Sequence, residues 1–186
     1  MTNPTVPWIV SQANILANVA KSLPKVQALI TGASYLIGMS MIFKAIFYLK
    51  IYGESRTMQT QSAHMKEPVM YFLIGSFLLY LPSGLHVLMS TTFGYSSPLA
   101  YAPVSSSNPS LNRLFGSGSL VGRPLVLIIQ TVGLIAFIRG LVLIARAAGQ
   151  GSQPGGTGKG LVHVFGGILA VNIVGTLQII NNTLYG

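Results

Sequence analysis

Few residues of this chain have the chemistry of a catalyst, and they lie far apart in the sequence. His64, His86 and His163 are isolated from one another in the sequence, and Glu54 and Glu67 are the only acidic residues. Structural and catalytic metal centres need three or four ligands, and general acid–base catalysis needs suitably placed partners. None of the serines has a plausible base beside it for nucleophilic catalysis. The sequence therefore predicts no catalytic residue, no metal site and no cofactor.

The run GGTGKG at positions 155–160 is similar at first sight to a phosphate-binding loop. A Walker A motif needs a glycine five residues before Gly158 and a serine or threonine after Lys159. This chain has Gln153 and Gly160 at those positions. The motif also lacks a preceding buried strand, so we interpret the run as a flexible turn without a nucleotide site.

Basic residues near the ends of apolar stretches are the remaining candidates for a site: Lys44, Lys50, Arg139 and Arg146. Lys44 and Arg139 lie one to two helical turns inside apolar stretches, where a charge is costly and is often functional. Arg139 and Arg146 are seven residues apart and share a helix face. Two interpretations stay open: the long side chains reach anionic phospholipid headgroups, or they line a conduit or meet a partner's carboxylate. Transport coupling is less favoured, because the apolar stretches contain no acidic residue.

The elements that carry these residues are apolar stretches long enough to cross a membrane. Hydrophobic residues make up 51% of the chain and charged residues only 7%, against about 25% charged residues in soluble domains. Stretches of about 20 apolar residues match a hydrocarbon core of about 30 Å. We therefore predict an all-α membrane protein with four transmembrane helices, at 26–48, 68–89, 124–145 and 161–180. Pro82 is expected to kink the second helix.

The four predicted helices form two tandem hairpins of similar sequence. Gly38–Lys44 aligns with Gly133–Arg139, 95 positions later, and Gly75–Gly94 aligns with Gly167–Gly186, 92 positions later. An even number of crossings in each repeat predicts the same membrane orientation for both. Spacing of apolar residues between Trp8 and Leu23 predicts a short N-terminal amphipathic helix. The predicted segments are 1–25 (N-terminal amphipathic segment), 26–93 (first hairpin), 94–123 (Ser/Pro/Gly-rich loop) and 124–186 (second hairpin).

Glycines within the predicted spans indicate close packing between helices, because small residues let membrane helices approach each other. Those we single out for helix packing are Gly32, Gly38, Gly75, Gly133, Gly167 and Gly175. The packing partner is either another helix of this chain or another subunit. Polar groups at membrane depth, Gln130, Asn172 and Gln178, are expected to form hydrogen bonds between helices.

The distribution of Lys and Arg predicts the orientation. Seven of the basic residues flank the turns inside the two hairpins, and four lie on the opposite side. Basic residues are in excess on the cytoplasmic side of a membrane, so the hairpin turns are predicted cytoplasmic, and the termini and the 94–123 loop periplasmic. The net charge of +9 is interpreted as this topology signal plus contact with anionic phospholipid, not as a direct nucleic-acid site.

Three stretches carry a resemblance to a known family: KVQALITGASYLIGMSMIFKAI, PVMYFLIGSFLLYLPSGLHVLMSTTFG, and the second hairpin with Arg139 and its NNTLYG end. The chain resembles the IcmC/DotE family of type IVB secretion systems, which is related to the TraQ proteins of IncI-type conjugation. The resemblance covers most of residues 20–186. It implies a non-enzymatic subunit of the bacterial inner membrane, in a machine that moves protein effectors, or DNA with proteins, across the envelope.

The partners implied are other membrane subunits of the secretion complex, anionic phospholipid and a possible homo-oligomer. The subunit would have a structural role or form a conduit. The alternatives are a pilin-like subunit of a conjugative filament and a small pore-former or transporter.

Overall fold

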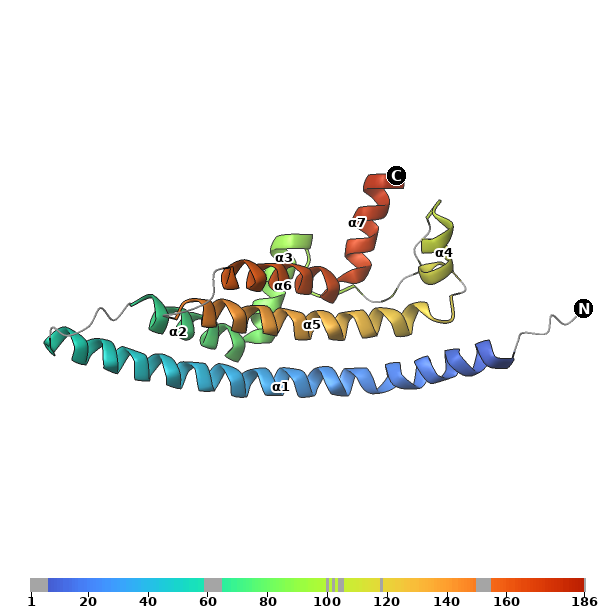
Figure 1. Cartoon of the computed structure of the whole chain (residues 1–186). Coiled ribbons are helices and arrows are strands. Elements are labelled where there is room, and N and C mark those ends of the chain that lie inside the picture. Colours follow the sequence, from blue (N-terminus) through green and yellow to red (C-terminus); the bar gives the residue numbers. More distant parts are fainter. Residues whose placement is uncertain are drawn as a thin grey trace, which may run out of the picture.

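The computed structural model describes residues 7–58, 65–99, 101, 103, 106–117, 119–149 and 155–185. Within these ranges the chain forms seven helices and no strand (Figure 1). The prediction of an all-helical chain is therefore confirmed. The helices are α1 (Pro7–Met58), α2 (Lys66–Leu79), α3 (Leu81–Phe93), α4 (Pro109–Phe115), α5 (Gly122–Ala147), α6 (Gly156–Val171) and α7 (Ile173–Tyr185).

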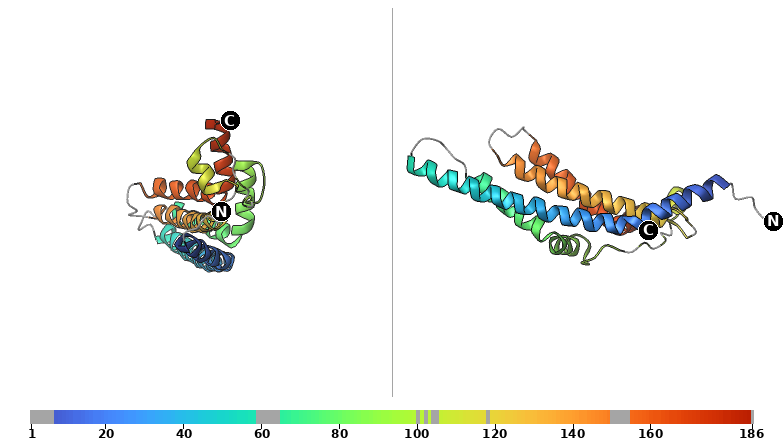
Figure 2. Two further views of the ribbon diagram at one scale, coloured as in Figure 1. Left: turned by 90° about the vertical axis from the view of Figure 1, so that its right-hand side faces the viewer. Right: turned by 90° about the horizontal axis from the view of Figure 1, so that it is seen from below.

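The helix α1 is one element of 52 residues with Pro24 in its interior. The prediction of a separate short amphipathic helix before residue 26 is wrong, because those residues are the first turns of α1. The helix also continues past Tyr48, its predicted end, to Met58. Pro24 has no N–H to donate to the preceding turn and so favours a kink, and α1 changes direction in its N-terminal part (Figure 2). At 1.5 Å per residue α1 is about 78 Å long.

Both predicted return helices are broken in the structure. The axes of α2 and α3 meet at 92°, and those of α6 and α7 meet at 89°. The first break is at Tyr80, two residues before Pro82, which occupies the first turn of α3 as prolines commonly do. The second break is at Asn172, where the sequence predicted an uninterrupted helix. Both α3 and α7 leave the bundle on the side away from α1 (Figure 1).

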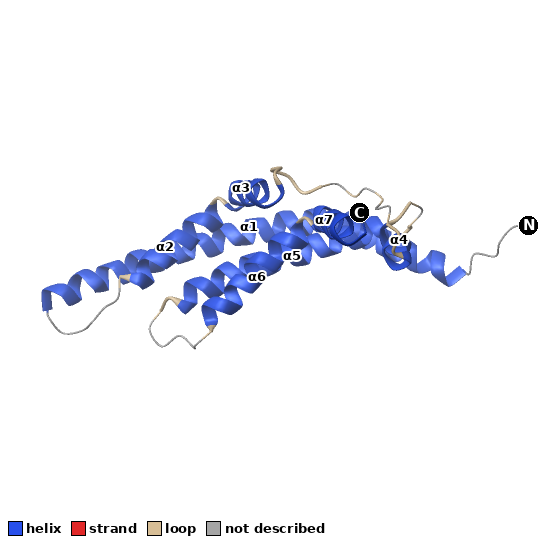
Figure 3. Cartoon of the chain, turned by 90° about the horizontal axis from the view of Figure 1, so that it is seen from above, coloured by secondary structure: helices blue, strands red, loops and turns tan. Residues whose placement is uncertain are grey.

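Four of the helices form the body of the molecule. α1 packs beside α2, α5 packs beside α6, and α5 also lies against α1 and α2 (Figure 3). The core contains Leu78 of α2 and Phe137 of α5, and Leu81 and Met89 of α3 pack against them; all four are fully buried. The rings of Phe77 on α2 and Phe137 on α5 are 5.9 Å apart. The α2–α5 contact therefore joins the two helical hairpins through aromatic packing.

The segment predicted as a loop at 94–123 contains the short helix α4. Asn108 caps it: its side-chain oxygen accepts hydrogen bonds from the backbone N–H groups of Ser110 and Leu111. Phe115 at its end forms a small apolar cluster with Val126 of α5 and Val174 of α7. The segment is thus fastened to the second hairpin by a cluster of its own.

The chain is a membrane protein by the length and composition of its helices. Within the described residues, Asn14–Glu54 and Gly122–Ala147 are each long and apolar enough to cross a membrane. The bent pairs α2–α3 and α6–α7 pass the same test only when each pair is counted as one span, so the number of candidate spans is two, or up to four.

Candidate functional site

The contact between α1 and α2 is built on two glycines that face each other. A Cβ atom added to Gly38 would lie 2.8 Å from the carbonyl oxygen of Gly75 and 3.0 Å from the backbone nitrogen of Leu79. A Cβ atom added to Gly75 would lie 2.9 Å from the carbonyl oxygen of Gly38 and from a side-chain carbon of Ile42. Carbon atoms at these distances from a backbone would force the helices apart. The two backbones can approach this closely only because both residues lack a side chain.

The contact between α5 and α6 uses the corresponding positions. A Cβ atom on Gly133 would lie 2.7 Å from the backbone nitrogen of Val171, the counterpart of Leu79. A Cβ atom on Gly167 would lie 2.7 Å from the backbone nitrogen of Phe137, the counterpart of Ile42. The sequence alignment and the packing therefore agree residue by residue at these four glycines.

The other two glycines of the predicted set lie in different surroundings. Gly32 has no heavy atom within 4 Å of an added Cβ, so no helix of the described chain packs on it. Gly175 lies against the hydroxyl group of Tyr95 and the side-chain amide of Asn172. The six glycines thus do not form one surface.

The break between α6 and α7 is fastened to the segment that follows α3. The buried side chain of Asn172 donates from Nδ2 to the hydroxyl group of Tyr95 at 2.6 Å, and its Oδ1 accepts from the backbone N–H of Leu99 at 3.1 Å. Sequence reasoning singled out Asn172 as a polar group between helices, but its partners lie in the connecting segment. Gln178, expected to act similarly, is exposed.

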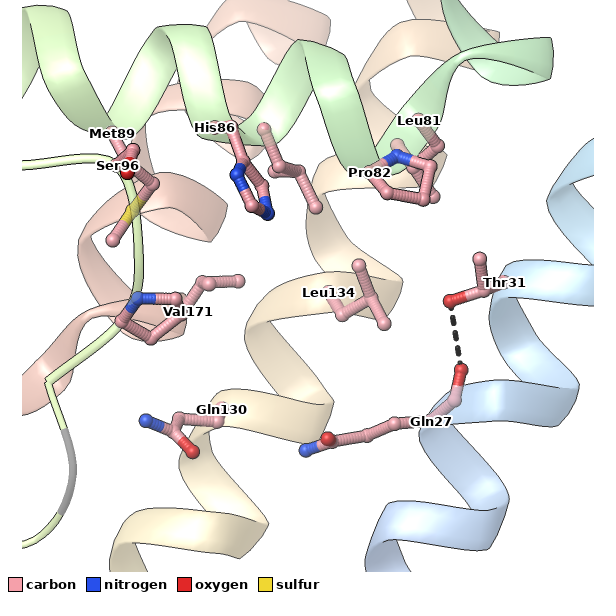
Figure 4. A pocket seen from close by; sticks show the side chains of 12 residues that line it. Gln27, Thr31, Leu81, Pro82, His86, Met89, Ser96, Gln130, Leu134 and Val171 are labelled. Carbon is pink, nitrogen blue, oxygen red and sulfur yellow. Dashed lines mark hydrogen bonds between the residues drawn. The ribbon is translucent and has the colours of Figure 1, made fainter.

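A cavity of about 240 Å³ lies where α3 crosses the bundle, between α1, α5 and the start of the 94–99 segment (Figure 4). Apolar residues such as Leu134 form most of its wall, and Gln27, Gln130 and His86 add polar groups. The Nε2 of Gln27 donates to Oγ1 of Thr131 at 2.9 Å. The cavity offers amide and imidazole groups for hydrogen bonding, and no carboxylate lines it. Sequence reasoning gave His86 no role, because its polar neighbours come from helices distant in the chain.

A second, larger cavity of about 510 Å³ is a groove between α1 and α5. Its apolar wall includes Ile30 and Ile37 from α1 and Ile138 from α5, and Arg139 and Arg146 line it from α5. Both arginines are exposed, and no carboxylate of the described residues lies within salt-bridge distance of either. An apolar groove beside two guanidinium groups has the chemistry to hold the acyl chain and phosphate of an anionic lipid.

Lys44 and Lys50 lie elsewhere, on the first hairpin. The Nζ of Lys44 is 5.9 Å from the ring centroid of Tyr71, within the range of a cation–π contact. The Nζ of Lys50 is 3.7 Å from Oε1 of Glu54, with both side chains mostly exposed, so this ion pair adds little stability. Lys44 and Arg139 occupy matching positions in the two hairpins, and the structure does not bring the four basic residues together.

The fold and these sites together define an all-helical membrane protein. In the part of the chain that the structure describes, no group of three or more His, Cys, Asp or Glu side chains could hold a metal ion. No family model, curated protein or solved structure matches the chain.

Proposed function

We propose that this protein is a non-enzymatic integral membrane subunit of a bacterial type IVB secretion apparatus, where it has a structural or conduit-forming role. One observation carries the proposal: a helical hairpin whose two helices meet at glycines occurs twice, with corresponding glycine contacts. In both copies the second helix breaks at about a right angle, at the aligned residues Tyr80 and Asn172. A unit repeated in this way is a packing module, which suits a scaffold or the wall of a passage. The assignment to a type IVB apparatus rests on the resemblance described above.

In the proposed topology the two hairpins cross the inner membrane in the same orientation. Helices α2 and α6 have 14 and 16 residues, so they are about 21 and 24 Å long, less than a hydrocarbon core of about 30 Å. In this topology α3 and α7, which follow the right-angle turns, lie along the membrane plane near the periplasmic face. The hairpin turns lie in the cytoplasm, and the termini and the 94–123 segment lie in the periplasm.

Anionic phospholipid is the proposed ligand of the α1–α5 groove. Arg139 and Arg146 supply positive charge beside apolar walls, and each lies toward the cytoplasmic end of α5 in the proposed topology. Snorkelling of arginine to headgroups costs little at this depth. Other membrane subunits of the secretion complex are the remaining proposed partners.

The test is deletion of the gene in a bacterium that uses the apparatus. Transfer of a reporter effector should fall to background and return with the wild-type chain. Gentle extraction should yield the protein in a high-mass complex with other membrane subunits, identified by crosslinking in native membranes and mass spectrometry. Normal transfer after deletion, or migration only as a free monomer, would overturn the proposal.

The functional alternative is a small pore-former or transporter, and the observation that favours it is the cavity to which Gln27, His86 and Gln130 contribute polar groups. Substitution of Lys44 and Arg139 by alanine distinguishes the two. Solute flux that disappears while secretion and assembly survive would establish the transporter and exclude the structural role. A pilin-like filament subunit is less favoured, because this chain has two fused hairpins and a long middle segment and is therefore larger than a simple pilin.

A further inference from the structure

The face of α5 that packs on α1 is well defined. Thr131 accepts the hydrogen bond from Gln27 of α1. Ile138 and Val142 face Ile37 of α1 across the groove. Thr131 and Ile138 are 6% and 7% exposed. The second hairpin therefore docks on the first through one face of α5.

The face of α1 that corresponds in the repeat to this face of α5 is exposed. Counting back 95 positions, the counterparts of Thr131 and Ile138 are Leu36 and Phe43, which are 71% and 64% exposed. The next residues on this face, Met39 and Phe47, are also exposed. The spacing of three, four and four residues keeps these four side chains on one side of the helix. The first hairpin thus presents, without a partner among the described residues, the face that the second hairpin uses for docking.

The surface of the first hairpin that receives α5 also has a counterpart, on the second hairpin. The second hairpin docks onto Ile37 of α1 and Phe77 of α2. Their counterparts, Val132 and Leu169, are exposed. Ile74, on the same face of α2 as Phe77, is buried, whereas its counterpart Gly166 has no heavy atom within 4 Å of an added Cβ. At Val132, Leu169 and Gly166 the second hairpin therefore offers an open receiving surface. Next to it, Leu125 and Ile129, the counterparts of Ile30 and Ser34, pack with Phe115 of the 94–123 segment.

We propose that copies of this chain associate head to tail, with the α1 face at Leu36, Met39, Phe43 and Phe47 of one copy seated on the α5–α6 face at Val132 and Leu169 of the next. At these positions each new contact repeats the hairpin–hairpin contact inside the chain. Because the two surfaces differ, the interface is heterologous and generates a ring or an open filament, not a closed two-fold dimer. The inference deepens the proposed function. It rests on one part of that proposal, namely that both hairpins cross the membrane in the same orientation.

A second copy is favoured over lipid because both halves of this contact already pack together within one chain. One pair of counterparts shows what a lipid-facing position looks like. Leu73 and Phe165 are both exposed, at 58% and 63%, so neither hairpin uses this position for docking. Leu73 is therefore the matched control for the proposed interface.

Cysteine crosslinking in native membranes tests the proposal directly, since the chain has no cysteine. Two differently tagged copies, one Phe43→Cys and one Val132→Cys, are co-expressed and treated with a short bifunctional thiol reagent. The expected result is a mixed-tag dimer. Either variant alone, and Leu73→Cys with Val132→Cys, should give only background. Phe47→Cys with Val132→Cys serves as a second pair, because the counterparts Val142 and Ile37 line the same groove inside the chain.

The equivalent contact inside the chain serves as the positive control. Ile37→Cys with Ile138→Cys in one copy should form an internal crosslink, because these are the counterparts of Val132 and Phe43. If the internal pair forms and neither mixed pair does, the proposal is overturned. A dimer from Phe43→Cys alone indicates a two-fold interface and also overturns it. Failure of the internal pair removes the template for the interface and counts equally against it.

The two proposals fail in different ways. If no mixed-tag dimer forms but deletion still abolishes effector transfer, the head-to-tail interface falls and the secretion role stands. If the dimers form but deletion leaves transfer unchanged, the interface stands and the secretion role falls.

Discussion

The amide of Asn172 donates a hydrogen bond of 2.6 Å to the hydroxyl group of Tyr95, although the two residues are 77 positions apart in the chain. The same buried side chain accepts from the backbone of Leu99. The break between α6 and α7 is thereby joined to the segment that leaves α3. Asn172 thus joins the second hairpin to the segment that leaves the first, at the end where both hairpins turn.

Replacing Asn172 with leucine should destabilise the protein. The substitution leaves the N–H of Leu99 and the hydroxyl of Tyr95 without their partner. Both residues are half-buried, so the loss should be near the lower end of the roughly 1–3 kcal/mol that an unsatisfied buried group costs. Unfolding in mixed detergent micelles measures the loss. Tyr80 occupies the aligned position in the first hairpin but is 71% exposed, so Tyr80→Leu is the matched control and should change stability little. Equal effects of the two substitutions would contradict a fastening role for Asn172.

Alanine at Gly133 should separate α5 from α6. Its Cβ would meet the backbone of Val171 at 2.7 Å, and overpacking of this kind costs about 1–3 kcal/mol. Gly32→Ala is the control, because nothing lies within 4 Å of its added Cβ, and its effect should stay within about 0.5 kcal/mol. Thermal unfolding in detergent compares the two variants. A Gly133→Ala variant as stable as the wild type would show that the helices can shift without cost.

Removing both arginines of the α1–α5 groove should reduce bound anionic phospholipid. The double variant Arg139→Ala, Arg146→Ala loses both guanidinium groups beside the apolar wall, so less phosphatidylglycerol should copurify. Native mass spectrometry of the extracted protein measures the bound lipid. Arg113→Ala in α4 is the control for loss of charge alone. Unchanged lipid in the double variant would argue that the groove has another occupant.

Cysteine labelling should place the two kinds of connection on opposite sides of the membrane. Ser106→Cys lies in the 94–123 segment, and Thr157→Cys lies at the start of α6. A membrane-impermeant thiol reagent added to cells with a permeabilised outer membrane should label the first and not the second. Labelling of the second alone would reverse the proposed orientation, and labelling of both would exclude it.

Helix identity was largely predictable from local sequence, and helix boundaries were less so. The predicted third helix, 124–145, matches α5, Gly122–Ala147, within two residues at each end. The sequence predicted a boundary between residues 25 and 26, just after Pro24, yet α1 runs through it. A single proline in a long helix costs a hydrogen bond without forcing an end, so local sequence could not decide between a kink and a break.

The sequence by itself determined the apolar stretches, the repeat and the glycines at which the helices of each hairpin meet. Hydropathy and residue size are properties of each position and its near neighbours. Only the tertiary structure decided the right-angle break at Asn172, where no proline or glycine stands, and only it brought His86 beside Gln27 and Gln130. It alone also decided that the docking face is buried on α5 and open on α1. Such features depend on which helix faces meet between segments far apart in the chain, and the local sequence of each segment does not specify those contacts.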